Sequence, residues 1–398
     1  MEPIVITSFT SVNSLGVGVA DIERKLTEKK SGLQYCEFPG AELDTFVGQV
    51  KGVDELSFKG PLKEFDCRNN RLAKMGLESD NFEENVVLAR EKYGPSRISV
   101  LIGTSTSGLH EMEKAYIYTN FESMHLPSSF HFKETFNMYS VSEYVRLCLG
   151  LSGPTATIST SCSSSAKVFC AASRMLQAGI CDAVVVGGVD SLCLSTLHGF
   201  FSLGLLSPVP CKPFDVNRKG LSIGEGAGFS LLEKIDNSRQ ESNLALWGYG
   251  ESDDGYHMTS PHPEGKGAIL ATNQALQSAG LTSSEIDYIN LHGTGTLEND
   301  KVEGKVIQNV FGKSVPCSST KGWTGHALGA AGILDAVISL ICIQKGLVPC
   351  NINTECLNPM SGIDIPLKNQ NTSLRRVLSN SFGFGGSNCC LIFGQLER

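Results

Sequence analysis

The sequence predicts an α/β fold in which two related halves pack into a layered sandwich with buried helices in the middle. Strands and helices alternate along the chain, which is the order typical of parallel crossover units. A short strand that leads into a Gly-, Ala- and Ser-rich helix occurs once in each half, as ISTSCSSSAKVFCAASRML and as CSSTKGWTGHALGAAGILDAVISL. Small residues let a helix be surrounded closely, so both helices are expected in the interior.

The elements of the first half are predicted from hydrophobic periodicity and from turn residues. Alternating β-branched residues indicate strands, and apolar residues three and four positions apart indicate helices. The succession of strand, helix and strand between residues 155 and 186 is typical of a parallel crossover. The predicted strands are residues 3–9, 97–103, 155–160 and 183–186, and the predicted helices are residues 19–33 and 163–178.

The second half repeats this rhythm. Strands are predicted at residues 245–250 and 288–291 and a helix at residues 266–279. The apolar stretch from Ile333 to Ile343 contains Asp335 and is too short to span a bilayer, so it is expected to be a buried helix. We expect the two halves to cover residues 1–236 and 237–398.

One segment departs from this pattern. Residues 105–138 carry aromatic, His and Met side chains among charges without clean periodicity, which predicts an irregular or mixed cap insertion. Such surface segments often line sites or subunit interfaces, and a loosely patterned cap is the alternative.

Composition excludes several classes of function. The net charge is -8 and there is no basic run, which argues against nucleic-acid binding and against a polybasic membrane patch. The N-terminal residues MEPIVITSF have no basic stretch leading into a long apolar one, so no secretory signal is expected and the cytoplasm is the expected location.

The 14 cysteines are scattered along the chain, which fits reduced, buried thiols better than disulfides. There is no Cys-x-x-Cys pair, and the adjacent Cys389 and Cys390 would point to opposite faces of a strand. We therefore expect no metal site.

Cys162 is the candidate nucleophile. It lies between a predicted strand and the start of a predicted helix, where unpaired backbone N–H groups and the helix dipole favour a thiolate. A sharp strand-to-helix turn also exposes a side chain at the edge of a sheet, as nucleophiles that attack carbonyls require. A buried structural thiol is the alternative, because most cysteines in small-residue stretches serve packing.

Three basic residues far along the chain could assist this thiol. His292, Lys321 and His326 each lie at the end of a predicted strand or the start of a helix. Each alone fits a structural role equally well. Together with an exposed thiol they indicate thioester chemistry, because two imidazoles can donate hydrogen bonds to one developing oxyanion while an ammonium group adjusts the electrostatics.

The chain contains six motifs, which are TSCSSSAK, CKPFDVNRKGLSIGEGAG, GYHMTSPHPEG, LHGTGTLENDKVEG, SSTKGWTGHALGAAG and NSFGFGGSN. In their order and their separations, these motifs resemble those of the β-ketoacyl-(acyl carrier protein) synthases of the elongating Cys-His-His type. The resemblance covers nearly the whole chain. It implies a thiolase-type α-β-α-β-α sandwich, acyl carrier protein as a partner, and a homodimer or a heterodimer with a ketosynthase-like subunit. It implies no cofactor, since the substrates are carried on phosphopantetheine.

The resemblance also assigns catalytic roles. Cys162, His292 and His326 match the family's triad, and Lys321 matches its lysine. Glu303 falls where we expect the acid that orders this lysine, and a solvated helix carboxylate is the alternative. The backbone N–H groups of Cys162 and Phe384 are expected to form the oxyanion hole.

Further residues are assigned to substrate binding. Thr294 and Thr296 are expected to contact the phosphopantetheine arm, with Thr259 as a weaker candidate, although local turn hydrogen bonds would also explain these threonines. Phe384 lies between glycines, so by resemblance its loop would gate acyl access. Phe200 resembles the aromatic residue near the family's acyl tunnel, and a core aromatic is the alternative.

The expected reaction is a decarboxylating Claisen condensation of an acyl thioester on Cys162 with malonyl-acyl carrier protein. It would serve fatty acid synthesis or a specialised polyene or polyketide pathway. One alternative is a chain-length-determining partner subunit of a heterodimeric ketosynthase, which the intact Cys-His-His set disfavours. Another is a degradative thiolase, whose late Cys-Gly motif is missing from NSFGFGGSN.

Overall fold

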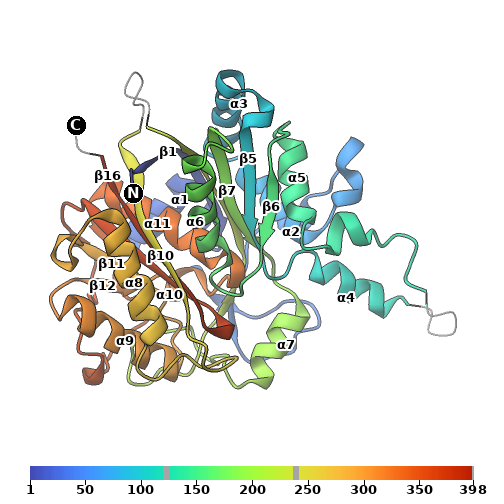
Figure 1. Ribbon diagram of the computed structural model, residues 1–398. Helices are drawn as coiled ribbons and strands as arrows, with labels where there is room; N and C mark the ends of the chain where they lie inside the picture. The colour runs from blue at the N-terminus through green and yellow to red at the C-terminus, as the bar shows by residue number, and fades with distance from the viewer. Residues whose placement is uncertain (120–124, 236–241, 397–398) are drawn as a thin grey trace.

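A computed structural model describes residues 1–119, 125–235 and 242–396. Its main feature is one large mixed sheet (Figure 1). Ten strands follow one another across this sheet, and the short β2 (Gly16–Val17) pairs with β1 off this path. In sheet order the ten strands are β12 (Cys317–Ser319), β11 (Tyr288–Leu291), β15 (Arg376–Phe382), β16 (Ser387–Gln395), β10 (Leu244–Asp253), β1 (Ile4–Asn13), β9 (Gly226–Glu233), β7 (Ala183–Asp190), β5 (Ile98–Gly103) and β6 (Thr155–Ile158).

The sheet contains the same pattern twice. Counted outward from the centre, the N-terminal strands stand in the order β1, β9, β7, β5, β6 and the C-terminal strands in the order β10, β16, β15, β11, β12. Each is the order first, fifth, fourth, second, third of its own half, with two antiparallel pairings followed by two parallel ones. The first strands of the halves join antiparallel, with Ile4 opposite Leu246. This confirms the prediction of two related halves.

The helices form layers around the two halves of the sheet. The helices α6 (Ser164–Gln177) and α11 (Ala331–Lys345) contact each other and strands of both halves, so they form the central layer. The outer layers consist of α2 (Arg68–Leu77), α3 (Phe82–Tyr93) and α5 (Ser140–Cys148) on the N-terminal side and of α8 (Lys266–Ala279) and α9 (Leu297–Phe311) on the C-terminal side (Figure 1). This arrangement is the predicted layered sandwich.

The central helix α11 is buried from Ala331 through Ile343. With the turn before it, the stretch Leu328–Lys345 is long and apolar enough to cross a membrane by length and composition. In the structure this stretch packs inside the protein, in the largest hydrophobic cluster, where it meets side chains of α6 and of the surrounding strands. The prediction of a buried helix is therefore confirmed.

Most predicted elements are present with small shifts at their ends, and two predictions need correction. The helix expected at residues 19–33 is α1 (Val19–Glu28), which ends early because Lys29 adopts a left-handed conformation with φ 55°. The strand expected to end at Val186 continues to Asp190. The cap insertion is of the mixed kind, since it contains α4 (Leu109–Ile117) and a π-helical turn at Phe132–Phe136. The expected boundary between residues 236 and 237 lies outside the described residues.

Several short elements lie outside the main sheet. A small sheet holds β3, β4 and β8, and β13 pairs with β14. These elements and two helices have the following bounds: β3 (Gln34–Tyr35), β4 (Phe46–Gly48), β8 (Ile223–Gly224), β13 (Leu347–Val348), β14 (Gln370–Asn371), α7 (Leu194–Ser202) and α10 (Lys321–Thr324). All 14 cysteines are free, and of these Cys356 is exposed and Cys148 half-buried.

Candidate active site

The turn between β6 and α6 presents Cys162. The strand ends at Ile158 and the helix begins at Ser164, which leaves a tight connection. Ser161 adopts a left-handed conformation with φ 54°, an uncommon one for a residue other than glycine. This turn places Cys162 in the interior between the two halves, where only 5% of its surface is exposed.

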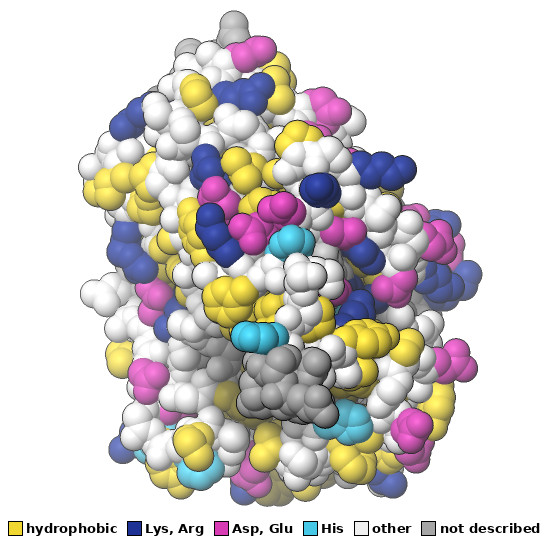
Figure 2. Space-filling model, turned by 90° about the vertical axis from the view of Figure 1, so that its right-hand side faces the viewer, with side chains coloured by type: hydrophobic (Ala, Val, Ile, Leu, Met, Phe, Trp, Pro, Cys, Tyr) yellow, Lys and Arg dark blue, Asp and Glu magenta, His cyan; other side chains and the backbone are white. Residues whose placement is uncertain are grey.

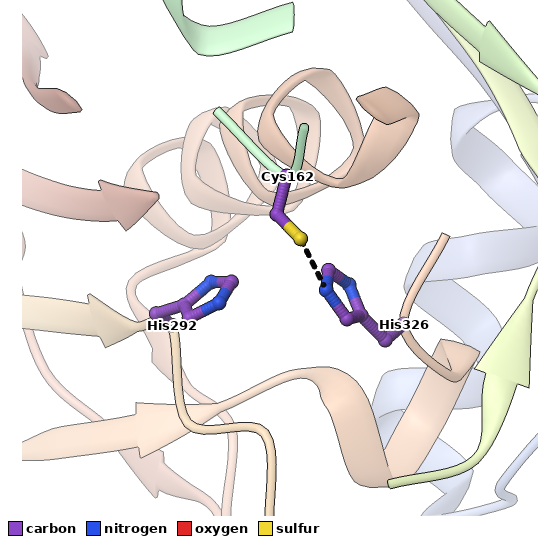
Figure 3. A group of neighbouring side chains, drawn as sticks. All are labelled: Cys162, His292 and His326. Carbon is purple, nitrogen blue, oxygen red and sulfur yellow. Dashed lines mark hydrogen bonds between the residues drawn. The ribbon is translucent and has the colours of Figure 1, made fainter. Parts of the chain in front are cut away.

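Both histidines reach Cys162 from the C-terminal half. His292 follows β11 directly, and His326 lies between α10 and the short turn Leu328–Ala330 that leads into α11. The Nε2 atom of His326 is 3.0 Å from the Sγ atom of Cys162, and the two imidazole centres are 5.3 Å apart and nearly perpendicular (Figure 3). The structure thus brings together three residues that are up to 164 positions apart in sequence.

Burial keeps all three side chains uncharged. It raises the pKa of Cys162 to about 11, although a hydrogen bond from the Phe384 N–H and the charge of Lys321 act in the opposite direction. Burial, then the Lys321 charge, lowers the pKa of His326 to about 3, and the same causes bring the pKa of His292 well below its usual value. Burial thus acts on the Cys162 pKa in the direction opposite to the one expected from the start of the helix.

The direction of this hydrogen bond depends on the tautomer of His326. With the ring proton on Nδ1, the Nε2 atom accepts a hydrogen bond from the Cys162 thiol, and with the proton on Nε2 the imidazole donates to the sulfur. The Nδ1 atoms of His292 and His326 have no hydrogen-bond partner among the described residues. In the first of these tautomers, His326 is placed to accept the thiol proton as the sulfur attacks.

Lys321 influences the two imidazoles through its charge. Its Nζ atom donates to Asp335 at 2.7 Å, and both side chains are buried. Thr320 also donates its hydroxyl to this carboxylate. The expectation that Glu303 orders Lys321 is therefore wrong, because Asp335 pairs with this lysine instead. A single carboxylate within the apolar stretch of α11 was the sequence signal for this partner.

Glu303 holds the backbone of the His292 loop instead. Its carboxylate, on α9, accepts the N–H of His292 at 2.8 Å, the N–H of Gly293 at 2.7 Å and the side-chain amide of Asn380 at 3.1 Å. Burial raises its pKa to about 7 against these hydrogen bonds, which favour the charged form. Its role is to position His292, because it binds the main chain on which the imidazole is carried.

The glycine-rich loop covers Cys162 from the other side. Phe384 follows Gly383, and its N–H, with the N–H of Cys162 itself, is directed at the Cys162 sulfur. The Phe384 ring stacks on Phe200 of α7 with ring centres 5.7 Å apart and planes inclined by 21°. Gly385 has a φ of 85°, which glycine adopts at little cost.

A pocket of about 420 Å³ leads to this centre. Lys321 and Glu303 do not line it, which agrees with roles behind the reacting groups. Sequence reasoning did not find Arg218, Lys219 and His257, which are polar residues in its wall. The predicted residues that line it are Cys162, His292, His326, Thr294, Thr296, Thr259, Phe200 and Phe384.

The donor atoms of Cys162, His292 and His326 lie within 4.8 Å of one another, so these three side chains could also hold a metal ion. A thiolate and two imidazoles are ligands that suit zinc. The expectation that the chain has no metal site stays a prediction.

Comparisons with known proteins agree with this geometry. The family model described as "Beta-ketoacyl synthase, N-terminal domain" matches residues 1–237, and "Beta-ketoacyl synthase, C-terminal domain" matches residues 245–355. The mitochondrial 3-oxoacyl-[acyl-carrier-protein] synthase of Arabidopsis thaliana is 31% identical, over 99% of this chain and 93% of the relative. The 3-oxoacyl-[acyl-carrier-protein] synthase 2 of Vibrio cholerae is also 31% identical, over 99% of both chains.

Solved structures extend the comparison to specialised enzymes. The ketosynthase ApeO, in complex with its chain length factor ApeC, from Xenorhabdus doucetiae is 36% identical with a TM-score of 0.89, over 99% of this chain and 98% of that chain. The ishigamide ketosynthase/chain length factor is 26% identical with a TM-score of 0.89, over 99% of both. The chain therefore belongs to the β-ketoacyl synthase family, as a carbon-carbon bond-forming acyltransferase of the elongating Cys-His-His type with a thiolase-type fold.

Proposed function

We propose that this condensing enzyme carries the growing acyl chain on Cys162 and extends it with malonyl-acyl carrier protein, using His292 and His326 as the catalytic imidazoles. The observation that carries this proposal is the 3.0 Å contact between the Cys162 sulfur and His326 Nε2, with His292 on the other side of the same pocket. The family's substrates arrive on acyl carrier protein, so no free cofactor takes part.

The first step transfers the acyl group. The Cys162 sulfur attacks the carbonyl carbon of the incoming thioester while its proton passes to His326 Nε2. The N–H groups of Cys162 and Phe384 stabilise the oxyanion. The bond to the carrier sulfur then breaks, His326 returns the proton to that sulfur, and a thioester on Cys162 remains. A neutral His326 suits both directions, because its lowered pKa keeps it from retaining the proton.

The second step forms the carbon-carbon bond. The carboxylate of the malonyl group leaves as carbon dioxide, and the electron pair of that bond moves into an enolate of the carrier thioester. Both imidazoles donate N–H hydrogen bonds to the enolate oxygen. The enolate carbon attacks the acyl carbon on Cys162, the Cys162 thiolate leaves and takes up a proton from solvent, and β-ketoacyl-acyl carrier protein is released.

The pocket suits a long, thin substrate arm. The hydroxyls of Thr294 and Thr296 lie 2.9 Å apart in the pocket wall, where they are available to the amides of phosphopantetheine. Thr259 lies in the same wall beside His257, with its N–H donating to the His257 ring. Because Cys162 is almost fully buried, a substrate reaches it only on such an arm.

We further propose that the active form is a dimer in the cytoplasm, with either a second copy or a ketosynthase-like partner. The structures with ApeC and with the ishigamide chain length factor support the second form. The complete triad makes this chain the active subunit rather than the chain-length partner. Figure 2 shows the face that carries α4 and α7, where exposed apolar side chains support a partner contact; they include Tyr116, Ile117, Tyr118 and Phe201.

We also propose two pathways in which this enzyme could act. A specialised polyene or polyketide route is supported by the likeness to a chain of the AntDE:AntF complex of a type II PKS, which is 25% identical with a TM-score of 0.86. The likeness to 3-oxoacyl-[acyl-carrier-protein] synthase 2 supports fatty acid synthesis. Both use the same condensation, so the acyl specificity has to be measured.

Intact-protein mass spectrometry tests the central claim. The enzyme is mixed with a panel of acyl-acyl carrier proteins and then with malonyl-acyl carrier protein. We expect a mass increase equal to the acyl group, mapped to Cys162, which disappears after malonyl addition. The Cys162→Ser variant should lose this thioester, and Cys356→Ser, which removes the exposed thiol, should retain it. Acylation at another residue would refute the proposal, and an active monomer on gel filtration would refute the dimer.

A further inference from the structure

Helix α7 forms one wall of the acyl pocket but is weakly held by hydrophobic burial. Of its nine residues only Leu197 is fully buried, and Phe201 is 53% exposed. Its Phe200 ring stacks on Phe384 in the loop above Cys162, and both rings line the pocket. The position of this ring pair therefore depends on the few contacts that hold α7 in place.

The N-terminus of α7 has no cap of its own. The first N–H groups of a helix need acceptors outside it, and the best capping residues are Ser, Thr, Asp and Asn. Cys193 occupies the capping position, its side chain does not cap the helix, and the first turn contains no acidic residue.

Glu113 of α4 supplies the missing cap from another part of the chain. Its two carboxylate oxygens accept one hydrogen bond each, from the N–H of Leu194 at 3.0 Å and from the N–H of Ser195 at 2.6 Å. A carboxylate at this position also interacts favourably with the helix dipole. One side chain thus provides both hydrogen bonds and charge at the end of a helix that has neither.

Glu113 is itself fixed in position. His110, one turn earlier on α4, lies 3.3 Å from the carboxylate, and its ring packs 5.3 Å from Phe38. Phe38 and Leu197 belong to one hydrophobic cluster, which Phe200 joins at its edge. Burial alone would raise the pKa of Glu113, but hydrogen bonds from His110 and Ser195 lower it, so the group is charged at neutral pH.

We infer that Glu113 is a positioning residue for acyl specificity: by capping α7 from α4, it holds Phe200 against Phe384 and so decides how easily bulky acyl chains reach Cys162. The inference rests on the proposed acylation of Cys162. Glu113 touches neither substrate nor nucleophile, and its effect passes through α7.

The test compares two glutamates of one helix. Glu113→Gln removes the charge and one of the two acceptors, whereas Glu111→Gln removes a carboxylate that pairs with Lys114 on the same helix. The rate constants of Cys162 acylation by acetyl- and octanoyl-acyl carrier protein are measured by quenched-flow mass spectrometry. We expect the octanoyl-to-acetyl ratio to rise about threefold or more in Glu113→Gln, because a looser α7 lets the rings separate. Glu111→Gln should leave it unchanged, and Phe200→Ala should raise it.

Hydrogen exchange distinguishes a role of Glu113 in acyl specificity from a purely structural role as a helix cap. In the peptide covering residues 193–203, Glu113→Gln should speed amide exchange about tenfold and Glu111→Gln should leave it unchanged. Faster exchange with an unchanged acylation ratio would overturn the role in specificity, and unchanged exchange would overturn the cap. If wild-type Cys162 is never acylated, the proposed function fails while the exchange result still tests the cap. Should Glu113→Gln not fold, Glu113→Asp, whose shorter carboxylate reaches one N–H, is expected to shift both readouts in the same direction by less.

Discussion

The two halves of the molecule share one strand order but contribute different chemistry to the site. The N-terminal half provides Cys162, the proposed nucleophile, at the start of α6. The C-terminal half provides the groups that handle protons and charge, which are His292, His326 and Lys321 with Asp335. The repeated topology brings both contributions to the same place, because equivalent strand ends of the halves meet around the central helices. Fold symmetry thus sets where the groups meet, and the residues at each loop set what they do.

The two central helices also differ, in how completely they are buried and in where they carry charge. Helix α6 is buried on one side, and its Arg174 reaches the surface to pair with Glu251. Helix α11 is buried on all sides up to Ile343, and yet it carries Asp335. The more apolar helix therefore contains the buried charge, which is tolerated there because Lys321 neutralises it and Thr320 donates a hydrogen bond.

The largest expected effect comes from removing either triad histidine of the C-terminal half. His292→Ala and His326→Ala should each lower malonyl decarboxylation by about 10²- to 10³-fold, because each removes a hydrogen bond to the enolate. Acylation of Cys162 should persist in both variants, with the greater loss in His326→Ala, whose imidazole contacts the thiol. Carbon dioxide release and intact mass measure the two steps. His198→Ala, which removes an exposed imidazole of α7, is the control, and normal decarboxylation in both histidine variants would refute the assigned roles.

A second prediction compares the buried ion pairs of the halves. Asp335→Ala leaves Lys321 unpaired, and Glu225→Ala removes the buried partner of Arg68 in the N-terminal half. Each should lower the free energy of unfolding by about 3–5 kcal/mol in urea titrations, because a buried charge is left uncompensated. Only Asp335→Ala should also lower the acylation rate of the folded fraction, because the Lys321 charge acts on the pKa of Cys162 and of both histidines. An equal loss of activity in both variants would contradict this difference.

The third prediction concerns packing in the central helices. Leu340→Ala on α11 should cost about 2–5 kcal/mol, since the side chain is fully buried and leaves a cavity. Met175→Ala on α6 should cost less, about 1–2 kcal/mol, because that side chain is only partly buried. Urea unfolding of both variants measures the contrast. Equal losses would show that the two helices are equally central to stability.

The smallest effect is a pH dependence in the nucleophile. With a pKa of about 11, Cys162 is mostly a neutral thiol at pH 7, and the thiolate fraction rises about tenfold per pH unit below that pKa. Alkylation of Cys162 by iodoacetamide, followed by peptide mapping in a Cys356→Ser background, should therefore still increase between pH 8 and pH 10. A plateau near pH 7 would mean that a thiolate already forms in the resting enzyme.

Much of the fold and part of the site could be predicted from local sequence patterns. Such patterns mark the small-residue helices, the strand before each helix, and the motifs around Cys162, His292 and His326. The structure brings these three side chains together. Helix α8 and strand β11 have the predicted bounds. These features could be predicted because each depends on neighbours in sequence.

Long-range contacts account for what sequence reasoning missed. Whether Glu303 or Asp335 pairs with Lys321 depends on how α9 and α11 pack, because Glu303 precedes the lysine in the sequence, Asp335 follows it, and no local pattern decides between them. The pKa of Cys162 depends on how completely both halves cover it, and the helix start alone suggested the opposite direction. Glu113 and Leu194 are 81 positions apart, and no local pattern links them.

The burial of α11 has a consequence for the order in which the protein is made. A ribosome synthesises the N-terminal half first, and the residues of β1, α6, β7 and β9 that surround α11 have therefore left it before α11 does. A segment apolar enough to pass for a membrane span thus emerges after part of its cover, whereas β15 and β16, which also pack against it, follow later. Reversing the order of the halves in a circular permutant would expose this segment to solvent and to the membrane-targeting machinery before its cover exists.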